Sequence, residues 1–259
     1  MDVPASRFRS SGVLPRWVSP SLMWTGGCVD LNYQGENVHS HFSVYLVRGS
    51  EKSLLIDTGH PAHWAQIEHD VEEFLQGRPL DYAFVTHGEF PHAGLLANWL
   101  RKYPQAIGIG EVRDYDLYYP DLADRLRFTR PSEHVDLGDR EVVFVPAVWR
   151  DIPTQWAFDT LDRVLFVSDA FAYLHFHQTG QCDLKTSEQP LPNVNMTRFF
   201  NERALVWTRY ADVTQTFSEI DALLGDLNPN LIAGAHGGIV DTKEAMISLV
   251  KEGMTVGWS

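Results

Sequence analysis

The sequence predicts an α/β fold in which β-sheets pack together and are covered by helices. Short apolar segments rich in β-branched and aromatic residues alternate with longer segments whose apolar residues recur at helical spacing. This order appears in both halves of the chain, and no linker separates the halves. We therefore expect a single domain over residues 36–259, preceded by an irregular Gly-, Ser- and Pro-rich arm over residues 1–35.

The first half contains four predicted segments after the arm. Residues 41–57 read as two strands joined by a turn. Residues 61–76 form a predicted helix, with a proline at its start and a glycine after its end. A short strand over 82–86 is followed by a helix over 93–103 and a strand over 106–109.

The second half repeats this alternation. Strands are predicted over 141–149 and 163–168, and a long amphipathic helical region over 201–227. A last strand over 231–235 precedes a closing helix over 241–251. Together the segments predict sheets that bury one face against each other and the other face against helices.

Composition excludes several classes of function. The chain has 259 residues and a net charge of −13, from 21 Lys and Arg against 34 Asp and Glu. This sign argues against binding to nucleic acid or to an anionic membrane surface, which both require cationic groups. No apolar run approaches the roughly 20 residues of a membrane span, and the first residues lack a signal-peptide core, so we expect a cytoplasmic protein. Cys28 and Cys182 are most simply free thiols.

Eleven histidines are more than this length usually carries, and three polar residues follow predicted strands directly. These are His87, Asp169 and His236, and residues beyond the carboxyl ends of strands can converge on one crevice. His87 also opens a His-x-Glu-x-x-His run with Glu89 and His92. Imidazole and carboxylate ligands suit zinc, iron or manganese, and the proline before His92 favours a loop over a helix here.

Four landmarks of the chain resemble the metallo-β-lactamase superfamily. They are Leu-Ile-Asp-Thr-Gly at 55–59, the metal loop at 87–92, Ser-Asp-Ala-Phe at 168–171 and Ala-His-Gly at 235–237. The resemblance covers roughly residues 40–250. It implies an αββα sandwich of two mixed β-sheets flanked by helices.

Glu89 stands where most hydrolytic members of that superfamily have a second histidine. With Glu89 at this position, the run resembles the metal loop of flavodiiron proteins and of stand-alone oxygen-binding diiron proteins. The resemblance implies that His87 and Glu89 bind one iron, that His92 and His236 bind the other, and that Asp169 bridges the two.

The chain departs from this pattern at two positions. Pro91 replaces the family's Asp, and Trp149 stands where a further His is expected. Five of seven ligand positions remain, and His92, Asp169 and His236 form a set of two histidines and one carboxylate typical of non-haem iron sites. His175 and His177 are candidates for replacement ligands, with surface-loop histidines as the alternative.

Three further residues are predicted around the metal. Asp57 is expected to orient a metal-bound imidazole. Trp149 is either a packing residue in the space of a lost ligand or, with Phe171, an aromatic wall for a substrate.

The leading functional hypothesis is a non-haem iron oxidoreductase that binds or activates O₂ or NO, with two irons expected and zinc or manganese as alternatives. Oxidation of a small organic substrate is one form of this hypothesis. No flavin domain or dinucleotide fingerprint is seen, so electrons are expected from a separate reductase or from the organic substrate itself. A metal-dependent hydrolase of a lactone, thioester or phosphoester, and a metal-binding sensor with a degenerate site, remain alternatives. A homo-oligomer also remains open.

Overall fold

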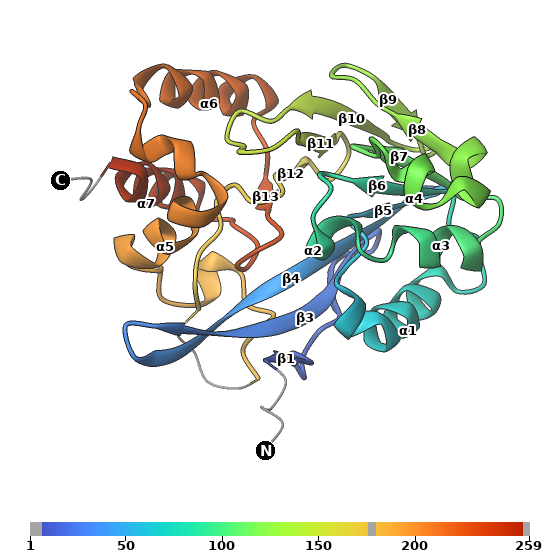
Figure 1. Cartoon of the computed structure of the whole chain (residues 1–259), viewed down its shortest axis with the longest axis horizontal. Coiled ribbons are helices and arrows are strands. Elements are labelled where there is room, and N and C mark those ends of the chain that lie inside the picture. The colour runs from blue at the N-terminus through green and yellow to red at the C-terminus, as the bar shows by residue number, and fades with distance from the viewer. Residues whose placement is uncertain (1–6, 176–179, 256–259) are drawn as a thin grey trace.

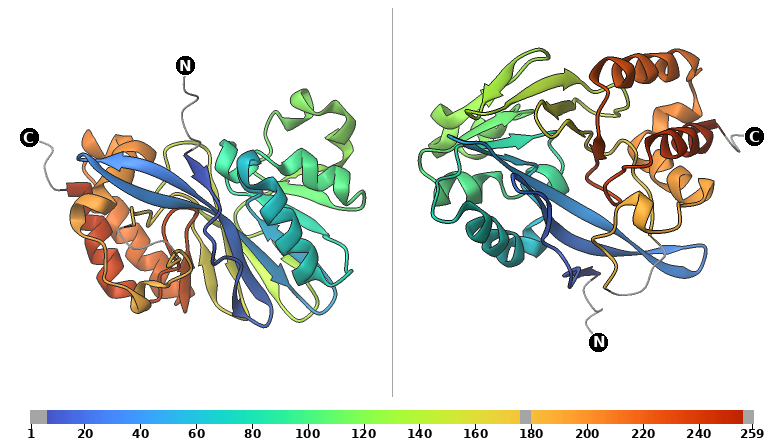
Figure 2. Two further views of the ribbon diagram at one scale, coloured as in Figure 1. Left: turned by 90° about the horizontal axis from the view of Figure 1, so that it is seen from below. Right: turned by 180° about the vertical axis from the view of Figure 1, so that it is seen from behind.

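Two mixed β-sheets form the centre of the fold, and helices cover both outer faces (Figure 1). The computed structural model describes residues 7–175 and 180–255. Figure 2 shows the two sheets lying between helices of the two chain halves. The predicted αββα sandwich is therefore confirmed. No helix in the described ranges is long and apolar enough to cross a bilayer.

The first sheet has eight strands in the order β1-β3-β4-β5-β6-β7-β8, with β2 paired to β3. Its first part is antiparallel, and β5 to β8 are parallel. The long β3–β4 hairpin pairs twelve positions and extends to one side of the molecule (Figure 1). The strands are β1 Phe8–Arg9, β2 Arg16–Ser19, β3 Leu22–Tyr33, β4 Glu36–Arg48, β5 Ser53–Ile56, β6 Tyr82–Val85, β7 Ile107–Gly110 and β8 Leu126–Phe128.

The second sheet has five strands in the order β13-β12-β11-β10-β9. All its pairs are antiparallel except β12 with β13, which run parallel. The strands are β9 His134–Asp136, β10 Glu141–Pro146, β11 Gln155–Asp159, β12 Val164–Phe166 and β13 Leu231–Ala233.

Helices from the first half cover the first sheet, and helices from the second half cover the second sheet. The first group is η1 Pro61–His63, α1 Trp64–Leu75, α2 Phe90–Ala93, α3 Leu96–Lys102, α4 Tyr115–Tyr118 and η2 Pro120–Arg125. The second group is η3 Thr186–Glu188, α5 Val194–Ala204, η4 Val206–Arg209, α6 Thr214–Leu227 and α7 Lys243–Thr255.

Three apolar layers hold these elements together. Between the sheets, the rings of Phe84 and Phe144 stack at 4.9 Å within a fully buried cluster. Phe74 of α1 packs under the first sheet, and Ile220 of α6 packs under the second. Burial of each such side chain stabilises the folded state by roughly 1.5–3 kcal/mol. This packing holds the two sheets and their helices in fixed positions.

The irregular arm predicted over residues 1–35 is wrong for residues 7–35, the part of it that the structure describes. Most of this segment forms β1, β2 and β3, and β3 is largely buried. Gly26 and Gly27 lie inside strand β3, although glycine is more typical of a loop. Gly26 has φ +128°, and a Cβ there would collide with the backbone of Phe42 on β4. Glycine is thus required for close strand approach and does not mark a loop here.

The continuous helical region predicted over 201–227 is also wrong. Helix α5 begins earlier, at Val194, where Asn193 caps it by accepting a hydrogen bond from Met196 N at 3.1 Å. A separate helix, α6, begins at Thr214, whose backbone N–H donates to the Asp212 carboxylate at 2.9 Å. The apolar pattern continues across both helices, so it does not reveal the second helix start, which is marked by local capping contacts.

Candidate metal centre

Three strands deliver polar residues to one edge of the two sheets. His87 follows β6, Asp169 follows β12, and His236 follows β13. His92 lies in the one-turn helix α2, and Glu89 is the residue before that helix. The loop predicted for this run is correct for His87 and Glu89 and wrong for His92. Pro91 lies in the first turn of α2, where the missing N–H has no helical partner to lose.

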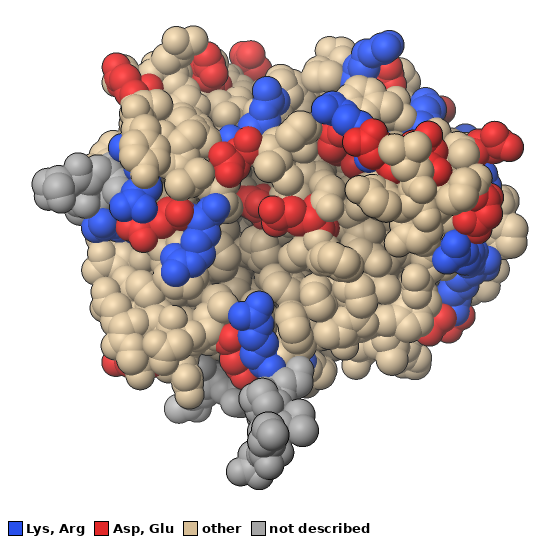
Figure 3. Space-filling model, viewed as in Figure 1, with Lys and Arg blue, Asp and Glu red and all other residues tan. Residues whose placement is uncertain are grey.

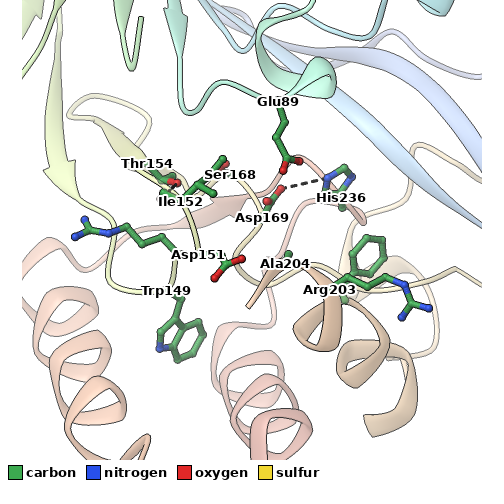
Figure 4. Close-up of a pocket in the computed structure, with 12 residues that line it drawn as sticks. Glu89, Trp149, Asp151, Ile152, Thr154, Ser168, Asp169, Arg203, Ala204 and His236 are labelled. Atoms are coloured by element: carbon green, nitrogen blue, oxygen red, sulfur yellow. Dashed lines mark hydrogen bonds and ion pairs between the residues drawn. The ribbon is translucent and has the colours of Figure 1, made fainter. Parts of the chain in front are cut away.

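Asp169 lies at the centre of the predicted set. Its Oδ1 is 3.1 Å from His92 Nε2 and 3.2 Å from His236 Nε2. Its Oδ2 is 3.7 Å from His87 Nε2, which in turn lies 3.9 Å from a Glu89 oxygen. The structure therefore brings all five predicted ligands together, and Figure 4 shows Glu89, Asp169 and His236 facing one another.

Each imidazole is held from behind by a hydrogen bond to its Nδ1 atom. His92 Nδ1 donates to Asp57 at 2.7 Å, and His236 Nδ1 donates to the backbone carbonyl of His41 at 2.8 Å. Ser168 Oγ lies 2.8 Å from His87 Nδ1. These contacts turn all three Nε2 atoms towards Asp169, as outer partners do for metal-bound histidines.

The groups behind the imidazoles are themselves fixed. Thr86 donates from its backbone N–H and its hydroxyl to Asp57 Oδ1, at 2.9 and 2.8 Å. The Thr86 hydroxyl also lies 2.9 Å from Ser168 Oγ. Asp57, Ser168 and Phe171 have φ values of 55°, 55° and 62°. Left-handed conformations at non-glycine residues concentrate at functional sites, where surrounding contacts maintain them.

Thr86 and Ser168 were missed by sequence reasoning, although each precedes a predicted ligand directly. A hydroxyl residue at the end of a strand, immediately before a ligand, is the signal that could have identified both.

Neighbouring acidic and basic groups shift the pKa values of the cluster residues. Burial alone would raise the pKa of Asp169, but the neighbouring His92 and His236 hold it well below its usual range. Burial lowers the pKa of His92, but the charges of Asp57 and Asp169 outweigh this and raise it to about 10. The hydrogen bond with His87 lowers the pKa of Glu89. Figure 3, viewed as in Figure 1, shows acidic groups at a hollow near the middle of the molecule. The site therefore favours a bound cation.

Three inward-facing atoms show that the residues fit a metal ion. His87 Nε2, His92 Nε2 and Asp169 Oδ1 are buried, and none makes a hydrogen bond of acceptable geometry to the described residues. One atom from each of these side chains lies within 4.8 Å of the others. Buried polar atoms without hydrogen bonds are costly, and a coordinated ion would satisfy them. Imidazole with carboxylate is a donor set suited to iron, manganese or zinc.

A cavity of about 180 Å³ opens beside the cluster. This is below the roughly 300–1,000 Å³ of pockets that hold drug-sized ligands, so it suits a diatomic or another small molecule. Figure 4 shows its walls, which come from both halves of the chain. They include Glu89, Trp149, Asp151, Phe200, Arg203 and His236.

Trp149 lies at the edge of this cavity, but its ring belongs to the core. It is 1% exposed and packs against Phe171 with ring centroids 5.0 Å apart. Figure 4 shows the indole pointing away from Asp169, towards the helices. The packing interpretation is therefore favoured for Trp149, and the buried ring of Phe171 is part of that packing. Asp151, which sequence reasoning missed, lines the same cavity.

The predicted replacement ligand His175 lies away from Asp169. His175 is buried against His39 and His41, with ring centroids 5.5 and 4.7 Å away. The ion pairs of Asp169 instead involve His87, His92 and His236. His177 lies outside the described residues.

Comparison with known proteins identifies the family. Residues 43–181 match the metallo-beta-lactamase superfamily, and the chain belongs to it. It is 30% identical over 237 residues to a coenzyme F420H(2) oxidase of Methanothermobacter marburgensis, covering 86% of this chain and 57% of that protein. It is 26% identical over 214 residues to the anaerobic nitric oxide reductase flavorubredoxin of Salmonella typhi, covering 76% of this chain and 41% of that protein. The chain spans about half the length of such relatives.

Solved structures share the fold. The rubredoxin oxygen:oxidoreductase of Desulfovibrio gigas superposes with a TM-score of 0.71 at 18% identity, covering 93% of this chain and 61% of that chain. The flavodiiron protein of Giardia intestinalis superposes with a TM-score of 0.72 at 15% identity, covering 93% and 59%.

Proposed function

We propose that this protein is a non-haem iron oxidoreductase that binds O₂ or NO at two iron ions. The observation that carries the proposal is the convergence of three inward-facing imidazoles and Glu89 on the half-buried carboxylate of Asp169. When bound, iron would supply open coordination positions and a change of oxidation state. Relatives named as an F420H(2) oxidase and a nitric oxide reductase support this chemistry.

The two irons would share Asp169. One would be held by His92 and His236, whose Nδ1 atoms are fixed by Asp57 and a backbone carbonyl. The other would be held by His87 and Glu89. Trp149 would supply no ligand, because its ring is in the core. Asp151 lines the same cavity and is a candidate for an additional carboxylate.

The cavity limits what can react. Its roughly 180 Å³ accommodates O₂, NO or a small organic molecule next to Asp169 and His236. Electrons would come from a separate reductase or from the organic substrate. A cytoplasmic location is part of the same proposal, because the two cysteines are thiols here, as in reducing compartments.

Metal analysis tests the proposal. Protein expressed with added iron should hold about two irons per chain, with an EPR or visible signal that changes on exposure to O₂ or NO. Glu89→Ala should lower the iron content, whereas Glu73→Ala, an exposed residue of α1, should not. Stoichiometric zinc at this centre without iron, together with turnover of a lactone, thioester or phosphodiester, would replace the proposal with a hydrolase.

A further inference from the structure

A second group of metal-binding side chains lies beside the β3–β4 hairpin, and it uses none of the five residues above. Cys28 Sγ lies 3.5 Å from Cys182 Sγ, and Cys182 Sγ lies 3.4 Å from His39 Nε2. We propose that Cys28, Cys182 and His39 form a separate zinc site, with His41 as the nearest candidate for a fourth ligand.

The strand register explains how the hairpin presents three of these residues. Cys28 pairs directly with His41, and Asp30 pairs directly with His39. Directly opposed residues of an antiparallel pair project from the same face, and so do residues two apart along one strand. Cys28, His39 and His41 therefore share one face of the hairpin.

Cys182 reaches that face from the second half of the chain. His175 forms an isolated antiparallel bridge with His39, in which His175 N donates to His39 O at 2.9 Å. Arg16 of β2 donates to the backbone carbonyl of Asp183 at 2.6 Å and to the Glu188 carboxylate. These contacts hold the segment around Cys182 against the hairpin.

The donor spacing matches a tetrahedral zinc site. Zn–S bonds of about 2.3 Å and Zn–N bonds of about 2.0–2.1 Å require S···S separations of about 3.8 Å and S···N separations of about 3.6 Å. The observed separations of 3.5 and 3.4 Å are close to these values. His41 Nδ1 lies 3.8 Å from Cys28 Sγ. The ligand atoms of Cys28, Cys182 and His39 all lie within 4.8 Å of one another, as a shared ion requires.

The ligand types favour zinc over the iron proposed for the other centre. Two thiolates with imidazole are a soft donor set, and four protein ligands without an open position are typical of a structural zinc site. Cys28 and Cys182 are fully buried and His39 is 5% exposed, so the site is closed to solvent. Zinc would displace one proton from each thiol, with no change of oxidation state.

Burial and the neighbouring Cys182 favour the protonated form of the Cys28 thiol before a metal binds. The hydrogen bond with Cys182 and burial both raise the pKa of Cys28. Zinc affinity should therefore increase with pH, because the two protons must be released.

Cobalt substitution tests the site directly. The full chain, purified with a non-thiol reductant, should take up about one Co²⁺ with an intense near-ultraviolet thiolate-to-cobalt band, and Zn²⁺ should displace it. The band should be lost in Cys28→Ser and in His39→Ala, and kept in His134→Ala, an exposed histidine. It should also persist in Asp169→Asn, which removes the carboxylate of the other centre.

Two results would overturn the inference. One is fully reduced protein that shows no thiolate-to-cobalt band in the unsubstituted chain. The other is a Cys28–Cys182 disulfide in protein purified under the same conditions, detected as the loss of two hydrogens by mass spectrometry. Both readouts use the unsubstituted chain, so an unstable variant does not affect them. Iron content and the O₂ response are measured separately, so this inference can fail without the proposed function failing.

Discussion

Two buried histidine clusters occupy this molecule, and their partners differ. At the strand ends, His87, His92 and His236 surround a carboxylate, and the Glu89 side chain is 62% exposed at the cavity. At the hairpin, His39 lies beside two thiols in a closed environment. Imidazole is common to both, so the partner atoms and the access to solvent distinguish a reactive centre from a structural one.

The largest effect should come from Asp169→Asn. The amide removes the negative charge shared by both proposed irons, so iron affinity should fall by more than about 100-fold, beyond the effect of losing an outer partner. Titration of the apoprotein with Fe²⁺ measures this change. Binding of Co²⁺ at Cys28 and Cys182 should stay the same. Loss of both metals together would show that the two clusters are not independent.

Trp149→His distinguishes the two interpretations of that position. The indole packs in the core against Phe171 and Phe217. The smaller, polar imidazole should therefore lower the free energy of unfolding by about 3 kcal/mol without raising iron content. Denaturant unfolding and metal analysis of the same sample measure both. If iron content rises instead, the position can supply a ligand and the side chain reorients.

Asp57→Asn tests the group behind His92. The variant keeps the shape but removes the charge that orients the imidazole at 2.7 Å. Iron affinity should fall by about 10- to 100-fold, as for other outer partners of metal-bound histidines. Asp70→Asn, a buried aspartate of α1 that hydrogen-bonds Thr25, is the matched control and should leave iron affinity unchanged. An equal loss in both variants would point to general destabilisation.

The smallest effect concerns the segment that carries Cys182. The hydrogen bond from Arg16 lowers the pKa of Glu188 from 4.5 to about 2. The stabilising contribution of the Arg16–Glu188 pair is therefore present above pH 4.5 and is lost as the pH falls towards 2. Glu188→Gln should cost about 0.5 kcal/mol at pH 7, because the pair is partly exposed and screened. The difference from the unsubstituted chain should disappear in acid, as measured by unfolding at several pH values. If the difference in unfolding free energy stays the same at every pH, the effect of Glu188→Gln comes from packing and not from the ion pair.

Local patterns predicted much of the fold. The helix from Trp64 to Leu75, the β10 strand and the closing α7 helix lie within a few residues of the predicted segments. Strand β3 was missed because glycine inside a strand resembles a loop in composition. The break between α5 and α6 was missed because one apolar stripe continues across two helix starts.

The five residues of the candidate metal centre could be proposed from the sequence because each lies at a strand end or in a short motif. The partners behind them were harder to predict, since only the fold shows which hydroxyl lies behind which imidazole, as for Ser168 and His87. The cysteine cluster was missed for the same reason. Cys28 and Cys182 are 154 positions apart, and no local pattern connects them.

The parallel pairing of β12 with β13 has an evolutionary consequence. It places Asp169 and His236 side by side, although the chain between them forms α5, η4 and α6 (Figure 1). The sequence of that helical insert can therefore diverge while the two residues stay in register. Because Phe200 and Arg203 of α5 line the cavity, substitutions there can alter what enters it while the proposed metal ligands stay the same. The proposed ligands and the α5 part of the cavity wall thus lie on separate parts of the chain.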